Sequence, residues 1–404
     1  MRDVADHASP VPILLLSTMA ALGGAERCFL RLLDGLDRRR WRPFLAGPPV
    51  GPLAEAAARL GVPMLPVHAP EVLDPDVVAD LFPESVSRPS RPTWRRRLRM
   101  QWRLARTLSA GIRLASRVVA HRIALVHVNS ARAALVGGVA GRLTGRPVVA
   151  HVRDIVHSPF EQPLRRLALE RLSDRFIAVS EATARVIGCP DRTDVVYDGL
   201  EPATLAARCP RRDPDPIAPN IAMVSFLSPW KGHEVFVHAA RLVLDHVPAA
   251  RFTIIGGDHG WPGLVAYRHR LERLVDELGL GRHVQLAGQK ALGPADFAAF
   301  DIFVHPPTAP DPFPGVILEA AAAGCPIVAT AVGGIPEIVV DRSSARLVTP
   351  GRPDAVAAAV LDLLRDPPLA RRLGEAARLR VQQFTLTRMV TETEAVYDRV
   401  LAGR

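Results

Sequence analysis

Residues 311–337 (DPFPGVILEAAAAGCPIVATAVGGIPE) are the stretch of this chain whose residue types could do chemistry. The stretch begins with Asp311, and seven residues separate this carboxylate from a second one, Glu319. A Phe-Pro-Gly turn between them leads into small and apolar residues typical of a helix. A helix start presents unpaired backbone N–H groups and a partial positive charge, so it can bind phosphate. Glu319 would lie about one turn into the helix, where it could accept hydrogen bonds from a ribose diol. The stretch predicts a pocket for a nucleotide-linked sugar. An ordinary αβ unit with a turn-forming Asp and a solvated Glu is the alternative.

The elements that must position these residues alternate between strand-like and helix-like runs, which predicts a doubly wound parallel α/β architecture. Strands are predicted in the first half at Val11–Ser17, Arg42–Ala46, Val62–Val67, Ile123–Val128, Pro147–Val152, Arg175–Val179 and Asp194–Tyr197. Strands are predicted in the second half at Ile221–Phe226, Arg251–Gly256, Val284–Leu286, Ile302–His305, Pro326–Ala329 and Ala345–Val348. Predicted helices include Pro52–Leu60, Ala131–Leu143, Glu234–His246, Tyr267–Leu278 and Thr385–Leu401.

A proline-rich segment, Cys209–Pro219, interrupts this alternation and is interpreted as an interdomain linker. A chain of 404 residues suits two domains of about 200 residues each. The predicted division is 1–208 for the first domain, 209–384 for the second, and 385–404 for a final helix.

Composition narrows the class of protein. Apolar residues make up 48% of the chain, which is ample for packed interiors. The four cysteines lie far apart without a CxxC pair, so neither a zinc site nor a disulfide framework is expected. No apolar run reaches about 18 residues, and two early acids, Asp3 and Asp6, are unlike a signal peptide. We therefore expect a cytoplasmic protein.

Positive charge is concentrated in the first half. Residues 1–205 hold 29 Arg and 20 acids, a net +9, whereas residues 206–404 hold 22 Lys and Arg and 21 acids, a net +1. Residues 88–106 (RPSRPTWRRRLRMQWRLAR) contain eight Arg, two Trp and no acid. Helical spacing would put Trp94, Leu98 and Trp102 on one face. Such a helix could lie on an anionic membrane surface, or could pack its Trp face on the core of the first domain.

Further candidate residues follow predicted strands, where an open parallel sheet binds its ligands. Gly23 and Gly24 follow the first strand and open a helix, so the backbone could approach a diphosphate closely. Lys231, one of only two lysines, precedes a helix in SFLSPWKGHEVFVHAARLV and could pair with a diphosphate. His151 and Arg153 follow one strand, and Asn129 follows another. Ser180 is predicted as a helix N-cap, and Glu337 as a first-turn charge.

These motifs together resemble glycosyltransferase family 4, the retaining enzymes of the GT-B fold. Residues 311–319 resemble its Glu-x7-Glu region, His151–Asp154 its H-x-R-D segment, and Ser228–Gly232 its S-P-W-K-G segment. The resemblance implies two Rossmann-like domains facing a cleft, with a C-terminal helix that crosses back to the first domain. It implies transfer from a nucleotide sugar without a metal or other cofactor. The acceptor proton would pass to the leaving diphosphate during same-face attack, and polysaccharide biosynthesis is the expected process.

The resemblance also implies roles for individual residues. Asp311 and His151 are expected to be catalytic, and Asn129 and Arg153 are expected on the acceptor side. The expected donor-binding residues are Gly23, Gly24, Lys231, Phe313, Gly315, Val316, Ile317 and Glu319. The expected partners are a nucleotide-sugar donor, a glycan or lipid-linked acceptor and an anionic membrane surface, but no nucleic acid.

One position departs from the family pattern. Ser225 and Phe226 replace its Gly-Arg, so the usual phosphate-binding Arg is missing. Weaker donor binding, an Arg supplied from elsewhere and lost activity all remain open. The alternatives are therefore a non-catalytic sugar-nucleotide binding protein and an epimerase or phosphorylase of the same fold. A nucleic-acid binder, which the pI of about 10.5 would allow, is disfavoured because stacking aromatics are few in the basic stretch.

Overall fold

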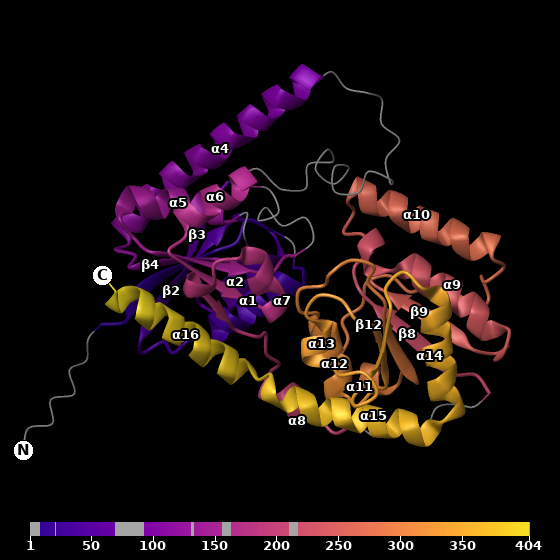
Figure 1. Ribbon diagram of the computed structural model, residues 1–404. Helices are drawn as coiled ribbons and strands as arrows, with labels where there is room; N and C mark the ends of the chain where they lie inside the picture. The colour runs from indigo at the N-terminus through magenta and orange to yellow at the C-terminus, as the bar shows by residue number, and fades with distance from the viewer. Residues whose placement is uncertain are drawn as a thin grey trace, which may run out of the picture.

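A computed structural model describes residues 9–20, 22–68, 93–130, 133–155, 163–209 and 217–403 (Figure 1). Two parallel β-sheets form its frame, with strand orders β3-β2-β1-β4-β5-β6-β7 and β10-β9-β8-β11-β12-β13. The first contains β1 (Val11–Leu16), β2 (Trp41–Gly47), β3 (Met64–Pro66), β4 (Leu125–Val128), β5 (Val148–Val152), β6 (Arg175–Ala178) and β7 (Thr193–Val195). The second contains β8 (Asn220–Val224), β9 (Arg251–Ile255), β10 (Val284–Leu286), β11 (Ile302–His305), β12 (Ile327–Thr330) and β13 (Arg346–Val348).

Helices connect the strands and cover both sheets (Figure 1). Those of the first half are α1 (Gly24–Gly35), α2 (Pro52–Arg59), α4 (Thr93–Ala120), α5 (Ala133–Thr144), α6 (Pro163–Leu172), α7 (Glu181–Ile187) and α8 (Pro202–Ala206). Those of the second half are α9 (His233–Leu244), α10 (Pro262–Glu277), α11 (Pro294–Ala298), α12 (Gly315–Ala322), α13 (Ile335–Ile338), α14 (Pro353–Arg365), α15 (Pro367–Arg380) and α16 (Leu386–Ala402). Single 3₁₀ turns occur at Pro190–Arg192, Pro229–Lys231 and Val381–Gln383.

Every strand predicted from the sequence is present, with ends that differ by at most two residues. The central strands β4, β5, β11 and β12 are buried on both faces, so each reads as a nearly continuous apolar run, whereas the edge strands β7 and β13 are only half-buried. The helix predicted from Tyr267 was placed too late, because it begins at Pro262, whose ring favours the first position of a helix. Most of the predicted linker, residues 210–216, lies outside the described residues.

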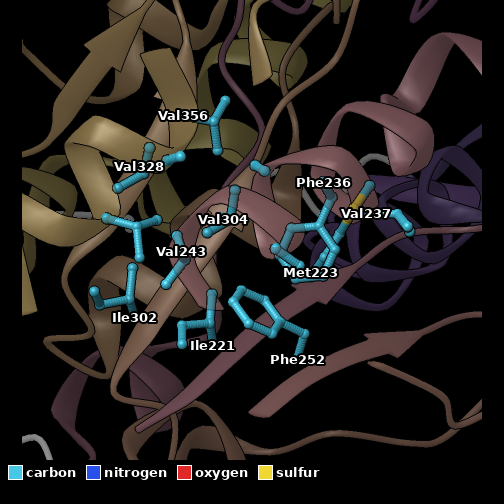
Figure 2. Packing of buried hydrophobic residues seen from close by; sticks show 14 of the residues in the cluster. Ile221, Met223, Phe236, Val237, Val243, Phe252, Ile302, Val304, Val328 and Val356 are labelled. Carbon is cyan, nitrogen blue, oxygen red and sulfur yellow. The ribbon is translucent and has the colours of Figure 1, made fainter. Parts of the chain in front are cut away.

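Each sheet separates two apolar cores. One core of the second sheet is built from strand residues such as Ile221 and Val304 and helix residues such as Phe236 and Val243 (Figure 2). In the first sheet, Val126 and Val128 face one core, whereas Leu125 faces the other. This alternation directs His127 and His151 towards the side of the sheet that α1 and α16 cover.

The last helix, α16, returns from the second domain to the first (Figure 1). Its residues Met389, Val396 and Tyr397 belong to the same apolar core as Ile13 and Phe29. This confirms the crossover that the family resemblance implied. Together the two parallel sheets and the returning helix have the GT-B arrangement.

Helix α4 lies on the outside of the first domain and packs against α5 (Figure 1). Its C-terminal half buries Ala110, Leu114 and Val118. Another face of the helix exposes Leu98, Trp102, Leu104, Leu108, Ile112 and Val119, which we call the α4 apolar stripe. Leu98 is 54% exposed and Trp102 56%, so this pair does not pack on the domain core. Residues 88–92 and the side chain of Trp94 lie outside the described set. Within the part of the chain that the structure covers, none of the helices has the length and apolar character needed to cross a membrane.

Candidate active site

Asp311 lies in the loop between β11 and α12, and it is the most strongly held side chain of the candidate site. Its Oδ2 atom lies 2.6 Å from Nζ of Lys231 and 2.9 Å from Nε2 of His305. Asp311 and Lys231 are 3% and 8% exposed, and His305 is fully buried. Burial alone would raise the pKa of Asp311, but the Lys231 charge and the His305 hydrogen bond lower it to about 2. The carboxylate is therefore held in its charged form.

His305 acts as a neutral donor in this group. Burial lowers the pKa of its imidazole, which outweighs the opposite effect of Asp311. A neutral imidazole that donates from Nε2 has a bare Nδ1, and the His305 Nδ1 has no hydrogen-bond partner among the described residues. His305 therefore fixes one oxygen of Asp311 without adding a second charge.

Aromatic rings cover Lys231. Its ammonium lies 4.0 Å from the centre of the Trp230 ring and 5.6 Å from that of Phe226, and these two rings meet edge to face. Such contacts stabilise a cation. Phe226, at the position where the family pattern has Arg, therefore shields Lys231 and offers no charge to a phosphate. The structure places Lys231 with Asp311, so its charge is already paired.

Two glycines hold the backbone of Asp311. A Cβ atom at Gly333, where φ is +58°, would lie 2.0 Å from the Asp311 carbonyl oxygen. The N–H of Gly334 donates to the same oxygen at 2.8 Å. Neither position has room for a side chain, which explains the Gly-Gly pair in the sequence.

Helix α12 begins at Gly315, and a Cβ at this residue would meet nothing within 4 Å, so open space lies beside the helix start. The side chains of two other predicted donor-binding residues pack in the core. Phe313 packs against Tyr197 and Phe384, and Ile317 is fully buried. Val316 is half-buried. Phe313 and Ile317 could reach a ligand only through their backbone.

Glu319 lies in the second turn of α12, as the spacing predicted, and its side chain is 34% exposed. Burial raises its pKa, and the charges of Arg31 and Arg27 oppose that rise. Nη2 of Arg31, from α1 of the first domain, lies 3.6 Å from the Glu319 carboxylate. Arg31 also approaches Glu201 at 3.5 Å. This contact joins the two domains beside the accessible carboxylate.

The first domain contributes a second polar group at the carboxyl ends of β4 and β5. The Arg153 side chain, which is 4% exposed, donates from Nε to Asn129 at 2.9 Å and forms an ion pair with Asp198. Its Nη2 has no partner within the described ranges. Gly23 lies close to the buried carboxylate of Glu26, whose pKa burial raises, and open space surrounds Gly24. The hydrogen bond between Arg153 and Asn129 shows that the structure brings these two predicted residues together at the ends of neighbouring strands.

His151 is fully buried beside another histidine. Its Nδ1 lies 3.3 Å from Nε2 of His127, whose Nδ1 lies 2.5 Å from the Tyr397 hydroxyl. Burial lowers the pKa of His127 to about 3, and lowers that of His151 well below its ordinary value. Both imidazoles are therefore neutral, and His151 is unsuited to act as a general base that carries positive charge.

Glu337 connects the domains at a helix start. Its two oxygens accept hydrogen bonds, each of 2.9 Å, from the backbone N–H groups of Glu181 and Ala182 in α7. Ser180 caps the same helix by accepting from Thr183, which confirms its predicted role. Glu337 does lie in the first turn of α13, but its carboxylate stabilises the helix of the other domain.

Sequence reasoning missed His305, Arg31, Asp198, His127 and Tyr397. His305 ends a predicted strand six residues before Asp311, and that position was a usable signal. The remaining four are joined to the site by contacts between distant segments, for which the sequence carries no local signal. No group of three or more metal-binding side chains occurs in the described residues.

Comparisons with known proteins cover most of the chain. The profile of Glycosyltransferase Family 4 matches residues 22–204, and that of Glycosyl transferases group 1 matches residues 214–380. A GDP-mannose-dependent alpha-(1-6)-phosphatidylinositol monomannoside mannosyltransferase of Mycolicibacterium smegmatis is 30% identical over 61% of this chain and 68% of its own length. A D-inositol 3-phosphate glycosyltransferase of Streptomyces coelicolor is 34% identical over 43% of this chain, and only 39% of that relative is spanned.

Solved structures share the fold over almost the whole length. HepE of Anabaena, solved with UDP and glucose, has a TM-score of 0.75 and 22% identity, covering 96% of this chain and 99% of HepE. Sucrose-phosphate synthase of Thermosynechococcus elongatus has a TM-score of 0.76 and 21% identity, covering 98% of this chain and all of the other.

Proposed function

This chain belongs to the group 1 glycosyltransferases of family 4, and we propose that it transfers a sugar, with retention, from a nucleotide-activated donor to a glycan or lipid-linked acceptor. One observation supports this most directly. Asp311 is held as a charged carboxylate at the approach to α12, with open space beside Gly315 and the accessible carboxylate of Glu319 in the next turn.

The proposed donor site lies on the second domain. The nucleotide ribose binds Glu319, and the diphosphate lies at the start of α12 against the amides of Gly315 and Val316. Gly23 and Gly24 approach the diphosphate from the first domain. Asp311 lies on the sugar side, and Asn129 and Arg153 face the acceptor. The protein then acts by positioning both substrates and by stabilising the charge that develops on the leaving diphosphate. The proposal involves no metal or other cofactor.

A screen of nucleotide sugars can identify the donor. The relatives point to GDP-mannose and UDP-glucose, because one is named for the first and HepE was also solved with the second. Thermal shift with each nucleotide sugar, followed by a donor hydrolysis assay, tests the function, with Glu319→Ala as the matched control. Binding with turnover supports the transferase. Absence of binding to any nucleotide sugar would contradict it.

Phe226 favours a second candidate, a non-catalytic sugar-nucleotide binding protein. The Arg of the family pattern is absent, and Lys231 is occupied by Asp311. The diphosphate would then meet fewer cations than in other members. Binding without turnover in the same screen, across all donors and with acceptors added, would support this candidate.

The α4 apolar stripe supports a peripheral position at the cytoplasmic face of a membrane. It exposes Trp102 and Ile112, and Arg106 stacks on the Trp102 ring at 4.5 Å. An apolar face beside many Arg residues suits an anionic lipid surface, and a lipid-linked acceptor would bring the first domain there.

Vesicle sedimentation tests this position. Recovery with anionic vesicles should exceed that with neutral ones and should fall with salt. The double variant Leu98→Ser/Trp102→Ser should lose binding, whereas Val50→Ser, which changes an exposed residue outside α4, should not. Equal recovery with both vesicle types would contradict membrane binding.

A further inference from the structure

Three buried side chains from three elements form a continuous contact beneath the candidate site: Tyr397 of α16, His127 of β4 and His151 of β5. The Tyr397 hydroxyl lies 2.5 Å from Nδ1 of His127, and Nε2 of His127 lies 3.3 Å from Nδ1 of His151. All three side chains are fully buried. Both nitrogens of His127 are therefore used, one on each side.

The Tyr397 hydroxyl determines the direction of the two hydrogen bonds in this contact. A phenol has one proton, and among the described residues the contact of this hydroxyl is His127 Nδ1. If the hydroxyl donates, His127 carries its own proton on Nε2 and donates it to Nδ1 of His151. His151 must then carry its proton on Nε2. The opposite order would leave the buried phenol proton without an acceptor, which is unfavourable.

At the far end of this contact, the His151 ring has one nitrogen that the contact does not use. Nε2 of His151 is buried and has no hydrogen-bond partner among the described residues. His151 lies at the carboxyl end of β5, two residues before Arg153, where the sheet faces the proposed substrates. Because His151 is neutral, its Nε2–H suits an uncharged oxygen such as a sugar hydroxyl.

We propose that Tyr397 is a positioning residue, which acts through His127 to hold His151 as the Nε2–H tautomer and so as a hydrogen-bond donor to a substrate hydroxyl. The part that concerns the substrate rests on the proposed function. The proton order does not, because it concerns only this chain.

Histidine tautomers can be measured directly by long-range ¹H–¹⁵N correlation NMR on the full-length protein. Spectra of His127→Gln and His151→Gln assign the two rings. We expect both histidines of the unaltered protein to be protonated on Nε2. A proton on Nδ1 of either histidine would overturn the proposal, so one folded variant, which assigns one ring, is enough to test it.

Tyr397→Phe removes only the hydroxyl. We expect this variant to shift His151 towards the Nδ1–H tautomer or a mixture. Tyr267→Phe is the matched control, because Tyr267 is also fully buried but its hydroxyl has no partner in the described residues. An unchanged His151 tautomer in Tyr397→Phe would refute the role of Tyr397.

Kinetics with UDP-glucose or GDP-mannose, whichever the screen identifies, tests the substrate part. One lost hydrogen bond corresponds to roughly a 10-fold loss in kcat/KM for Tyr397→Phe, with the affinity for the bare nucleoside diphosphate unchanged. An equal loss in nucleoside diphosphate affinity would show a structural effect instead. Failure of the donor screen would leave the NMR result intact, so the two proposals fail separately.

Discussion

Replacing Lys231 by Met should destabilise the protein because it leaves the buried Asp311 carboxylate without its cation. Breaking a buried ion pair by removing one partner costs roughly 3–5 kcal/mol. The fall of the Asp311 pKa from 3.8 to about 2, which Lys231 and His305 cause together against the effect of burial, corresponds to about 2 kcal/mol. We therefore expect Lys231→Met to lower the free energy of unfolding by about 2–5 kcal/mol.

A double-mutant cycle at neutral pH measures the coupling energy between Lys231 and Asp311. Lys231→Met, Asp311→Asn and the double variant are unfolded in urea, and tryptophan fluorescence reports the transition. The double variant should be more stable than the sum of the single changes predicts, by at least about 2 kcal/mol. Arg352→Met is the matched control, since its pair with Asp354 is exposed and should contribute little to stability.

The pH dependence of the free energy of unfolding provides an independent test. The folded pKa of Asp311 is depressed, so its contribution to stability is complete above about pH 4 and is lost as the pH falls towards 2. In Lys231→Met, burial should raise the pKa, so this variant should lose less stability on acidification. A coupling energy below about 0.5 kcal/mol, together with parallel pH profiles, would refute the assignment.

Three further changes test neighbouring parts of the site. Glu319→Ala should weaken nucleotide binding about 10-fold or more without unfolding the protein, and unchanged affinity in calorimetry would remove Glu319 from the ribose site. Phe226→Arg should strengthen nucleoside diphosphate binding by about 10-fold, because Lys231 is already paired with Asp311 and the added guanidinium would face the phosphates. Calorimetry at two salt concentrations checks this, and weaker binding would show that the Phe226 ring itself is needed. Glu337→Gln should lower stability by about 1 kcal/mol through the lost charge at the start of α7, and should speed proteolysis between the domains; an unchanged digestion pattern would show that Glu337 does not hold the domains together.

The fold could be predicted from the sequence because its central strands are buried on both faces and stand out as short apolar runs. Residues such as Ile302–His305 form the same strand in the prediction and in the structure. Helix ends were less certain, since the start of α10 depends on Pro262 and the loop before it. The division at residue 208 remains our proposal.

The candidate site was predictable only where its residues lie in one segment. Asp311, Glu319 and the glycines at 333 and 334 lie within one short stretch, so their spacing was informative. The partners of Asp311 were not predictable, because Lys231 comes from another strand–helix connection 80 residues away. The pairing of Arg31 with Glu319 likewise depends on how two domains meet. Phe313 was expected at the donor and its ring packs against Tyr197 and Phe384, because a Phe in a loop carries no signal that separates packing from binding.

The return of α16 to the first domain makes the order of synthesis matter. The core around Ile13 and Phe29 is closed by Met389, Val396 and Tyr397. Glu394 of the same helix accepts from the Asp37 backbone N–H and pairs with Arg40. On the ribosome, the first domain would therefore emerge with one apolar face uncovered and wait for the whole second domain to be translated. In topological terms, the second domain is an insertion within the first, so a truncation that removes only residues 386–402 should damage the domain made first.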